Sequence, residues 1–225
     1  MKKILIAAAH PDDEILGCGG TISRLVNEGH KVYTLILGEG ITSRDERRDR
    51  KKREEEIKEL KKQINKANKI IGVKKVFTFD FPDNRFDSIP LLTIIKKVEK
   101  IKNQIKPDII FTHFNNDLNI DHKKTYEAVL TATRPIKNET VKTIYSFEVL
   151  SSTEWKFPVT FSPNVFFDIS KTIDKKIEAI KKYKNELHSF PHPRSVETIL
   201  TNAKLWGSKS GMKYAEAFEL VRYNE

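Results

Sequence analysis

Cysteine is nearly absent from the chain, and so is any long apolar run. Only one of the 225 residues is a cysteine, Cys18, so no internal disulfide can form and nothing points to an oxidising compartment. No stretch approaches the ~20 consecutive apolar residues of a membrane-spanning helix. The run from Ile4 to Ala9 is shorter than the roughly 7–15 residues of a signal-peptide core. We therefore expect a cytoplasmic protein without a transmembrane segment.

Glycine and proline are scarce as well, with nine of each, which excludes a fibrous or low-complexity chain. Hydrophobic residues make up 38% and charged residues 32%, so we expect one globular domain spanning residues 1–225. The net charge of +10 raises the alternative of an RNA- or glycan-binding module. However, the densest charge block, 44–62, interleaves acids with bases, which is typical of a solvated helix face with i,i+4 ion pairs. We expect no nucleic-acid partner.

Short apolar runs alternate with helical periodicity along the chain. Strands are predicted at 3–9, 31–37, 76–79, 108–112, 140–149 and 165–169. Helices are predicted at 19–27, from the segment after Gly40 to about Ile71, and at 91–105, 121–133 and 170–187, with shorter elements finishing the chain. Strands separated by helices favour an α/β fold, a Rossmann-like arrangement of three layers with a mainly parallel sheet and helices on both faces. Ligands bind such folds beyond the carboxyl ends of the strands.

The first predicted strand is followed directly by a polar cluster, His10-Pro11-Asp12-Asp13-Glu14. His10 and Asp13 lie three residues apart across a strand-to-helix turn, so an imidazole and a carboxylate can converge on one ion. Asp12 lies between them and can face the open side of that ion. Alternatively, Asp12 and Asp13 cap the following helix, because carboxylates suit helix N-termini. This segment by itself leaves both interpretations open.

A second polar cluster, from His113 to His122, follows the fourth predicted strand and contains Asp117 and Asp121. A third ligand from this loop would leave a fourth position for water, as in catalytic zinc sites. Alternatively, Asp121 caps the next helix and His122 has no special role. Two polar clusters at the ends of two strands favour a divalent metal.

The segment Ala9-His10-Pro11-Asp12-Asp13-Glu14, together with Asp121-His122, resembles the signature of the LmbE-like deacetylases. This family includes the N-acetylglucosaminyl-phosphatidylinositol (PIG-L) de-N-acetylases and enzymes of mycothiol and bacillithiol synthesis. The resemblance runs nearly end to end and implies a Rossmann-like fold. It implies that His10, Asp13 and His122 bind Zn²⁺, although such N and O ligands also suit other divalent ions. It implies a general base at Asp12 and hydrolysis of the acetamide of an N-acetylated, GlcNAc-type amino sugar to acetate and a free amine.

One position departs from the family pattern. Many members have His-Pro-Asp-His in the second motif, and the first histidine is thought to stabilise the oxyanion, whereas this chain has Asn119-Ile120-Asp121-His122. Asn119 can donate a hydrogen bond but supplies no positive charge. We therefore consider Asn119, His113 and His192 together as candidate catalytic residues.

Four arginines are candidate substrate-binding residues. Arg44 and Arg53 flank the predicted loop-to-helix junction after the second strand, Arg85 follows the third strand, and Arg194 lies in a loop that contains two prolines. An arginine can hold a phosphate or a sugar hydroxyl with two hydrogen bonds, although a surface ion pair is the alternative for each. We expect a small-molecule amino-sugar conjugate as the partner, and a homo-oligomer is among the open alternatives.

The main competing hypothesis is a nucleotide-binding Rossmann protein without hydrolase activity. The segment Gly17-Cys18-Gly19-Gly20 loosely resembles a glycine-rich phosphate loop. Against this hypothesis, three acids stand between the first strand and these glycines, where they would repel a pyrophosphate, and the spacing does not match G-x-G-x-x-G. The sequence therefore favours the deacetylase.

Overall fold

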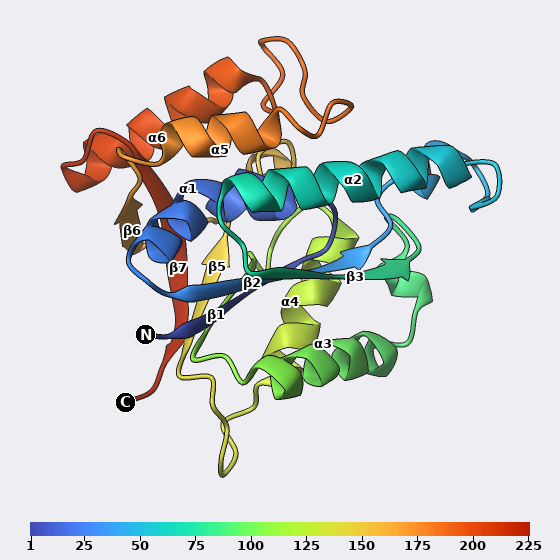
Figure 1. The fold of residues 1–225 in the computed structure, drawn as a ribbon, viewed down its shortest axis with the longest axis horizontal. Coiled ribbons are helices and arrows are strands. Elements are labelled where there is room, and N and C mark those ends of the chain that lie inside the picture. The colour runs from blue at the N-terminus through green and yellow to red at the C-terminus, as the bar shows by residue number, and fades with distance from the viewer.

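The computed structural model describes residues 1–225 and places all of its strands in one seven-stranded sheet (Figure 1). The strands are β1 (Lys3–Ala8), β2 (Lys31–Gly38), β3 (Lys75–Phe81), β4 (Ile109–His113), β5 (Thr143–Phe147), β6 (Val165–Asp168) and β7 (Ala215–Tyr223). The helices are α1 (Asp13–Asn27), α2 (Glu54–Ile70), α3 (Leu91–Ile105), α4 (Ile120–Ala132), α5 (Ile173–Ile180) and α6 (Val196–Ser210). Short 3₁₀ turns occupy Thr42–Arg44, Phe86–Ser88 and Thr153–Trp155.

The strand order is β3-β2-β1-β4-β5-β7-β6. The pairs from β3 to β5 are parallel, whereas β7 runs antiparallel to both of its neighbours. The sheet is therefore mixed and mostly parallel, and the predicted α/β fold class is confirmed.

Helices cover both faces of the sheet (Figure 1). Successive side chains of β1 point to opposite faces, and each set is buried by a different group of helices. Ile4 and Ile6 point into an apolar core shared with α1, α2, α5 and α6. Leu5 and Ala7 point into a second core shared with α3 and α4. Because successive side chains of a strand face opposite sides, a strand buried on both faces is apolar throughout. The turn after β1 is thereby held between the two layers.

The first helix begins earlier than predicted, at Asp13 and not at Gly19. The glycines form the interior of α1, where a Cβ on Gly17 would lie 2.3 Å from the Phe147 ring and one on Gly20 would lie 2.8 Å from Ile169. These glycines therefore serve close packing against the sheet. They do not form a phosphate-binding loop, which removes the feature on which the nucleotide-binding alternative depended.

The second helix is shorter than predicted, because residues 45–53 are irregular. Two of their arginines reach back to Glu39 outside the segment: Arg48 bonds Glu39 at 2.8 Å, and Arg50 pairs with it at 3.0 Å. Arg53 bonds Asp45 within the segment. Farther along, Lys58 and Glu54 form the expected i,i+4 pair at 2.9 Å. Mixed charge thus marks an ion-paired loop followed by a solvated helix face.

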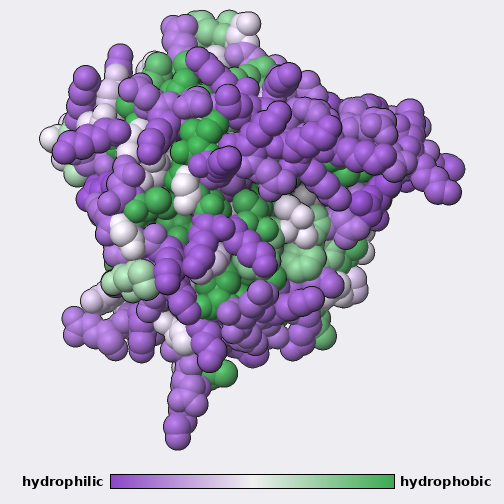
Figure 2. Space-filling model, in the orientation of Figure 1, coloured by the Kyte–Doolittle hydropathy of each residue, from purple (hydrophilic) through white to green (hydrophobic).

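The C-terminal part differs most from the prediction. Helix α5 ends at Ile180, not at Leu187, and the following turns lead to α6 and to β7, a strand of nine residues that we did not predict. No helix combines the length and the apolar character needed to cross a membrane. The face in Figure 2 is mostly hydrophilic, with apolar atoms between α2 and α3, where the edge strand β3 is partly exposed.

Candidate metal centre

Two polar turns meet at one edge of the sheet, because β1 and β4 are parallel neighbours. The turn after β1 carries His10 and Asp13, and the loop after β4 leads to His122 on the first turn of α4. One donor atom from each of these three residues lies within 4.8 Å of the other two. The three residues predicted to bind zinc are therefore brought together.

Asp13 is the central member of this group. Its Oδ2 accepts a hydrogen bond from the His10 backbone N–H at 2.7 Å and lies 3.4 Å from both His10 Nδ1 and His122 Nε2. Asp13 Oδ1 and His122 Nε2 are buried and have no hydrogen-bond partner in the protein. Buried polar atoms without partners are costly. A divalent cation would satisfy both, and the donor set of two imidazoles and one carboxylate fits zinc.

Two further carboxylates orient the histidines from the far side. His10 Nε2 lies 2.8 Å from Asp121 Oδ2, while Phe86 N–H donates to the other oxygen of Asp121 at 2.8 Å. His122 Nδ1 makes an ion-pair contact of 3.1 Å with Asp117 Oδ1, outside hydrogen-bond geometry. Metal-binding histidines typically give their second nitrogen to a carboxylate, which fixes the ring. His10 Nδ1 and His122 Nε2 therefore remain available to an ion.

A second group of potential ligands, His10, Asp83 and Asp121, shares the His10 ring with the first. Its atoms already have protein partners, because Asp121 accepts from Phe86 and from His10, and Asp83 Oδ2 accepts from the Ser43 hydroxyl at 2.5 Å. We therefore favour His10, Asp13 and His122 as the metal group.

The electrostatics differ between the two adjacent aspartates. Burial by itself raises the pKa of Asp13, but the His122 and His113 imidazoles outweigh it and hold this pKa well below its usual range. Burial raises the pKa of Asp12 well above its usual range, against the opposing effect of Arg194. One carboxyl is thus kept as an anion beside the imidazoles, while its neighbour has a high proton affinity.

Asp12 has an unusual backbone conformation, with φ of 105° at the position before α1. Such a conformation is strained for any residue except glycine and occurs mainly at functional sites. The Asp12 N–H donates to Glu14 Oε2 at 3.0 Å, and Arg194 Nη1 donates to Asp12 Oδ2 at 2.8 Å. The other carboxylate oxygen, Oδ1, makes no hydrogen bond in the protein.

A polar cavity of about 130 Å³ opens beside this turn. None of its lining residues is a large hydrophobic one: they are His10, Pro11, Asp12, Gly40, Ser43, Arg44, Asp83, Asn84, Asn119, Glu186 and Arg194. The cavity lining therefore includes three predicted site residues from outside the turn after β1: Asn119, Arg44 and Arg194. Asp83 and Asn84 belong to the polar segment 83–87 after the third strand, which the sequence indicates as a candidate to face the cleft. Glu186 was missed, since nothing in the sequence distinguishes it from other polar residues.

The remaining predicted arginines lie outside the cavity lining. Arg53 donates to Asp45 at 2.8 Å and to Glu56 at 2.7 Å, so it holds the loop before α2. Arg85 Nη2 donates to the Glu46 carbonyl oxygen at 2.8 Å. Their role in substrate binding stays a prediction.

Neither additional histidine lines the cavity. His113 is fully buried, stacks on His122 with ring centroids 3.9 Å apart, and accepts the Ala9 N–H at its Nε2. His192 lies against Trp155, with ring centroids 6.0 Å apart, and its Nδ1 accepts the Arg194 backbone N–H at 3.0 Å. The catalytic role of both histidines stays a prediction.

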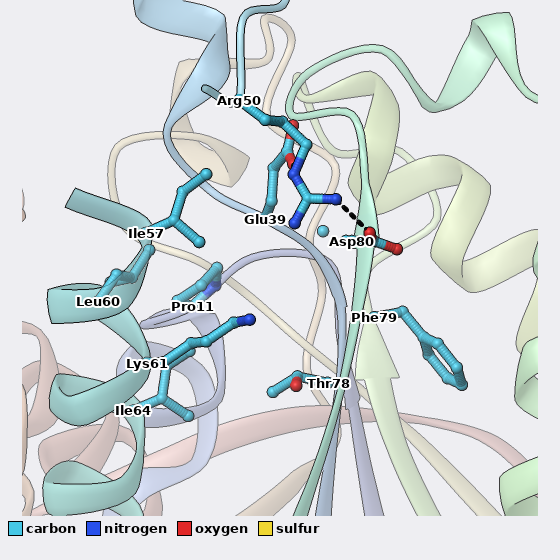
Figure 3. A pocket seen from close by; sticks show the side chains of 11 residues that line it. Pro11, Glu39, Arg50, Ile57, Leu60, Lys61, Ile64, Thr78, Phe79 and Asp80 are labelled. Carbon is cyan, nitrogen blue, oxygen red and sulfur yellow. Dashed lines mark hydrogen bonds and ion pairs between the residues drawn. The ribbon is translucent and has the colours of Figure 1, made fainter. Parts of the chain in front are cut away.

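A second cavity, of about 170 Å³, shares only Pro11 with the first and lies between α2 and the edge strand β3 (Figure 3). Its wall on α2 is apolar, with Ile57, Leu60 and Ile64. At its rim Arg50 forms ion pairs with Asp80 and with the buried Glu39. Lys61 extends into the opening (Figure 3). This second cavity holds no group of candidate metal ligands.

The fold and this centre together define a doubly wound α/β protein with a histidine–aspartate centre beyond the carboxyl ends of its parallel strands. The model of the PIG-L family, described as GlcNAc-PI de-N-acetylase, matches residues 5–133, which is more than half of the chain. The chain belongs to this family, as the resemblance predicted.

Individual relatives agree with this assignment. The chain is 30% identical over 190 residues to the uncharacterized deacetylase YaiS of Escherichia coli, covering 82% of this chain and 91% of that protein. It is 28% identical over 230 residues to the diacetylchitobiose deacetylase of Thermococcus kodakarensis, covering 98% and 84%. The N,N'-diacetylchitobiose deacetylase structure from Pyrococcus horikoshii superposes with a TM-score of 0.78 at 22% identity, covering 98% and 84%, and this likeness shows the fold.

Proposed function

We propose that this protein is a zinc-dependent de-N-acetylase that hydrolyses the acetamide of a GlcNAc-type amino sugar to a free amine and acetate. The observation that carries the proposal is the pair of buried, partnerless atoms, Asp13 Oδ1 and His122 Nε2, beside His10 and the free oxygen of Asp12. The names of the relatives, which include a diacetylchitobiose deacetylase, support the class of substrate.

His10, Asp13 and His122 would hold the metal, with Asp121 and Asp117 behind the two histidines. When bound, a zinc ion supplies Lewis acidity and lowers the pKa of a coordinated water to about 7. Three protein ligands leave room for that water, as in other catalytic zinc sites. Another divalent metal with N and O ligands would serve the same purpose.

Asp12 is the proposed general base. Its Oδ1 accepts a proton from the attacking water while a C–O bond forms at the acetamide carbon, and its raised pKa favours this transfer. The same carboxyl then gives the proton to the departing nitrogen as the C–N bond breaks. Arg194 holds Oδ2 throughout, so the free oxygen keeps its direction.

The polar cavity lining suits a sugar more than an apolar ligand. Arg44, Asp83 and Asn84 present donors and acceptors to hydroxyl groups, and the Asn119 amide lies at the same opening. We propose a small amino-sugar conjugate as the substrate. A cytoplasmic location, a single domain over residues 1–225 and a homo-oligomer remain predictions beside this function.

The test is acetate release from a panel of N-acetylglucosamine compounds, which includes diacetylchitobiose. A chelator is expected to abolish the release and added zinc to restore it. Asp12→Asn should lower kcat by about 10²–10⁴, the usual contribution of a general base. Asp174→Asn, an exposed aspartate on α5, is the matched control and should leave kcat unchanged. If no acetate is released and metal analysis finds no divalent ion bound, the proposal is wrong.

A further inference from the structure

Hydrolysis of an amide passes through a tetrahedral species with a negative oxygen, and donors aimed at that oxygen stabilise it. A positive charge in the cavity is worth more than a neutral donor, because the surroundings are partly desolvated. The cavity lining contains two permanent cations, Arg44 and Arg194. Only the cation that lies close to the reacting groups can stabilise the oxyanion.

Arg194 lies closest to the reacting groups. Its Nη1 is 2.8 Å from Asp12 Oδ2, and its side chain is 20% exposed. Nη1 also donates to Glu186 Oε2 at 3.0 Å, and Nε donates to the Ser151 hydroxyl at 2.6 Å. The remaining amino group, Nη2, donates to no protein atom and is not among the buried atoms that lack partners. Nη2 is therefore accessible and without a protein partner, in a side chain that lines the cavity.

The other candidates are less suitable. The Asn119 amide carries no charge, and its Nδ2 already donates to Asn84 Oδ1 at 2.7 Å. The side chain of Arg44 is 39% exposed and is held by Glu186 Oε1 at 3.0 Å, whereas Arg194 bonds the other oxygen of that carboxylate. His113 is buried behind His122, and His192 lies outside the cavity lining. Arg194 is the one cation that lies both in the cavity and in contact with Asp12.

We propose that Arg194 is a catalytic residue whose Nη2 donates to the carbonyl oxygen of the acetamide and stabilises the oxyanion. This inference rests on the proposed deacetylase function. As the C–O bond forms, a water proton moves to Asp12 and the carbonyl π electrons move onto oxygen. The negative charge thus migrates from Asp12 to the substrate, while the guanidinium, which gains and loses no proton, stays between the two positions.

The surroundings of Arg194 fix it for this purpose. Glu186 and Ser151 hold the guanidinium from two directions, and Arg44 holds Glu186 in turn. A donor group that is already oriented pays no reorganisation cost when the charge develops. The alternating chain Asp12–Arg194–Glu186–Arg44 therefore keeps Nη2 pointing in one direction.

The experiment compares Arg194→Met and Arg194→Lys with the wild-type zinc-loaded protein. Arg24→Met, a half-buried arginine on α1 that pairs with Glu28 and lies far from the cavity lining, serves as the control and should behave as the wild type. Removing one oxyanion donor typically lowers kcat about 10²–10³-fold, and we expect this loss for Arg194→Met with KM changed by less than about threefold. Arg194→Lys should recover part of the loss, and added guanidinium ion should partly rescue Arg194→Met.

Two readouts do not depend on turnover. The zinc dissociation constant should match that of the wild type in both variants, which excludes a collapsed site. A methylphosphonamide analogue of the substrate, which carries tetrahedral oxygens at the reacting centre, should lose affinity for Arg194→Met by the same factor as kcat/KM.

The outcomes separate the two proposals. Suppose that the wild type releases acetate and that Arg194→Met keeps kcat within about threefold of the wild-type value, whether or not KM rises. Arg194 then does not stabilise the oxyanion. If kcat falls while analogue affinity is unchanged, Arg194 only positions Asp12 and the inference is wrong. A wild-type protein that releases no acetate from any substrate in the panel and binds no divalent ion overturns the deacetylase function itself.

Discussion

The two cavities that meet at Pro11 differ in how their buried polar atoms are satisfied. In the cavity between α2 and β3, the buried Glu39 has Arg48 and Arg50 as ion-pair partners. Beside the other cavity, Asp13 Oδ1 and His122 Nε2 are buried without any partner. The cavity whose buried carboxylate has ion-pair partners is the larger of the two, at about 170 Å³ against about 130 Å³. Of these two cavities, the one beside buried atoms without partners, and not the larger one, adjoins the proposed metal group.

The same contrast extends to the carboxyls buried near each cavity. Glu39 faces two guanidinium groups, whereas Glu14, next to the metal turn, has only neutral donors: the Tyr183 hydroxyl at 2.6 Å, the Asn68 amide at 2.8 Å and the Asp12 backbone N–H. Burial therefore raises the pKa of Glu14 to about 7. The buried carboxyl beside the larger cavity is thus paired with cations, whereas the one next to the proposed metal ligands is not.

The largest expected effect concerns Glu14. A carboxyl whose pKa is raised from 4.5 to about 7 contributes stability that is present below about pH 4.5 and is lost as the pH rises through 7. The loss amounts to about 3 kcal/mol by about pH 8. In Glu14→Gln this part of the pH dependence should disappear, as measured by urea unfolding of metal-free protein. Glu28→Gln, an exposed residue, is the control, and parallel curves for wild type and Glu14→Gln would contradict the assignment.

The next effect tests the support of the metal ligands. Asp117 holds His122 and accepts hydrogen bonds from the Ser152 and Thr153 hydroxyls. Loss of such a supporting carboxylate typically weakens metal binding about 10–100-fold. We expect this loss in the zinc affinity of Asp117→Asn, measured by competition with a chelating dye. Asp174→Asn should bind zinc as the wild type does. Equal affinity for both variants would mean that His122 needs no orienting partner.

A smaller effect should separate two arginines that the sequence could not tell apart. Arg44 lines the polar cavity, whereas Arg53 is held by Asp45 and Glu56 outside it. Loss of one substrate hydrogen bond by Arg44→Met should raise KM by about tenfold, equivalent to about 1.4 kcal/mol. Arg53→Met should raise KM less. The reverse order in steady-state kinetics would place the substrate nearer to the loop before α2.

The smallest effect is expected for a substitution in the cavity between α2 and β3. Lys61 extends into the opening between α2 and β3 and forms none of the ion pairs in the structure (Figure 3). We expect Lys61→Met to change kcat/KM by less than about twofold, because surface charges away from a site contribute little. A large loss of acetate release in this variant would contradict the contrast between the cavities and assign function to both.

The prediction of the fold succeeded where the pattern was local. Helix α3 has the predicted bounds, Leu91–Ile105, because a strong apolar stripe begins after Pro90 and ends where Lys106 adopts a left-handed conformation. The start of α1 was wrong because three glycines in its first turns lowered its apparent helical propensity, while their packing against Phe147 and Ile169 is a tertiary effect. β7 was missed because it also depends on tertiary contacts: its partners β5 and β6 are distant in sequence.

In the candidate site, too, residues close in sequence were easier to predict than contacts between distant residues. The sequence indicates His10, Asp12 and Asp13 as adjacent polar residues after one strand and His122 in a polar cluster after another, and the family resemblance predicts their roles. The contact between Arg194 and Asp12 spans 182 positions and carries no periodic signal. Glu186 was missed because it lies in a turn that we had assigned to a helix. Neighbours in sequence could be predicted, whereas partners assembled by the fold could not.

The antiparallel placement of β7 has a consequence for the order of assembly during synthesis. β6 pairs only with β7, and the buried Glu216 of β7 accepts the backbone N–H groups of Gly20 and Thr21 in α1. Every proposed metal ligand is therefore synthesised before the strand whose Glu216 binds the backbone of α1. Contacts of such long sequence separation form late and slowly. Until β7 is made, α1, which carries the proposed ligand Asp13, lacks the hydrogen bonds between its backbone and Glu216.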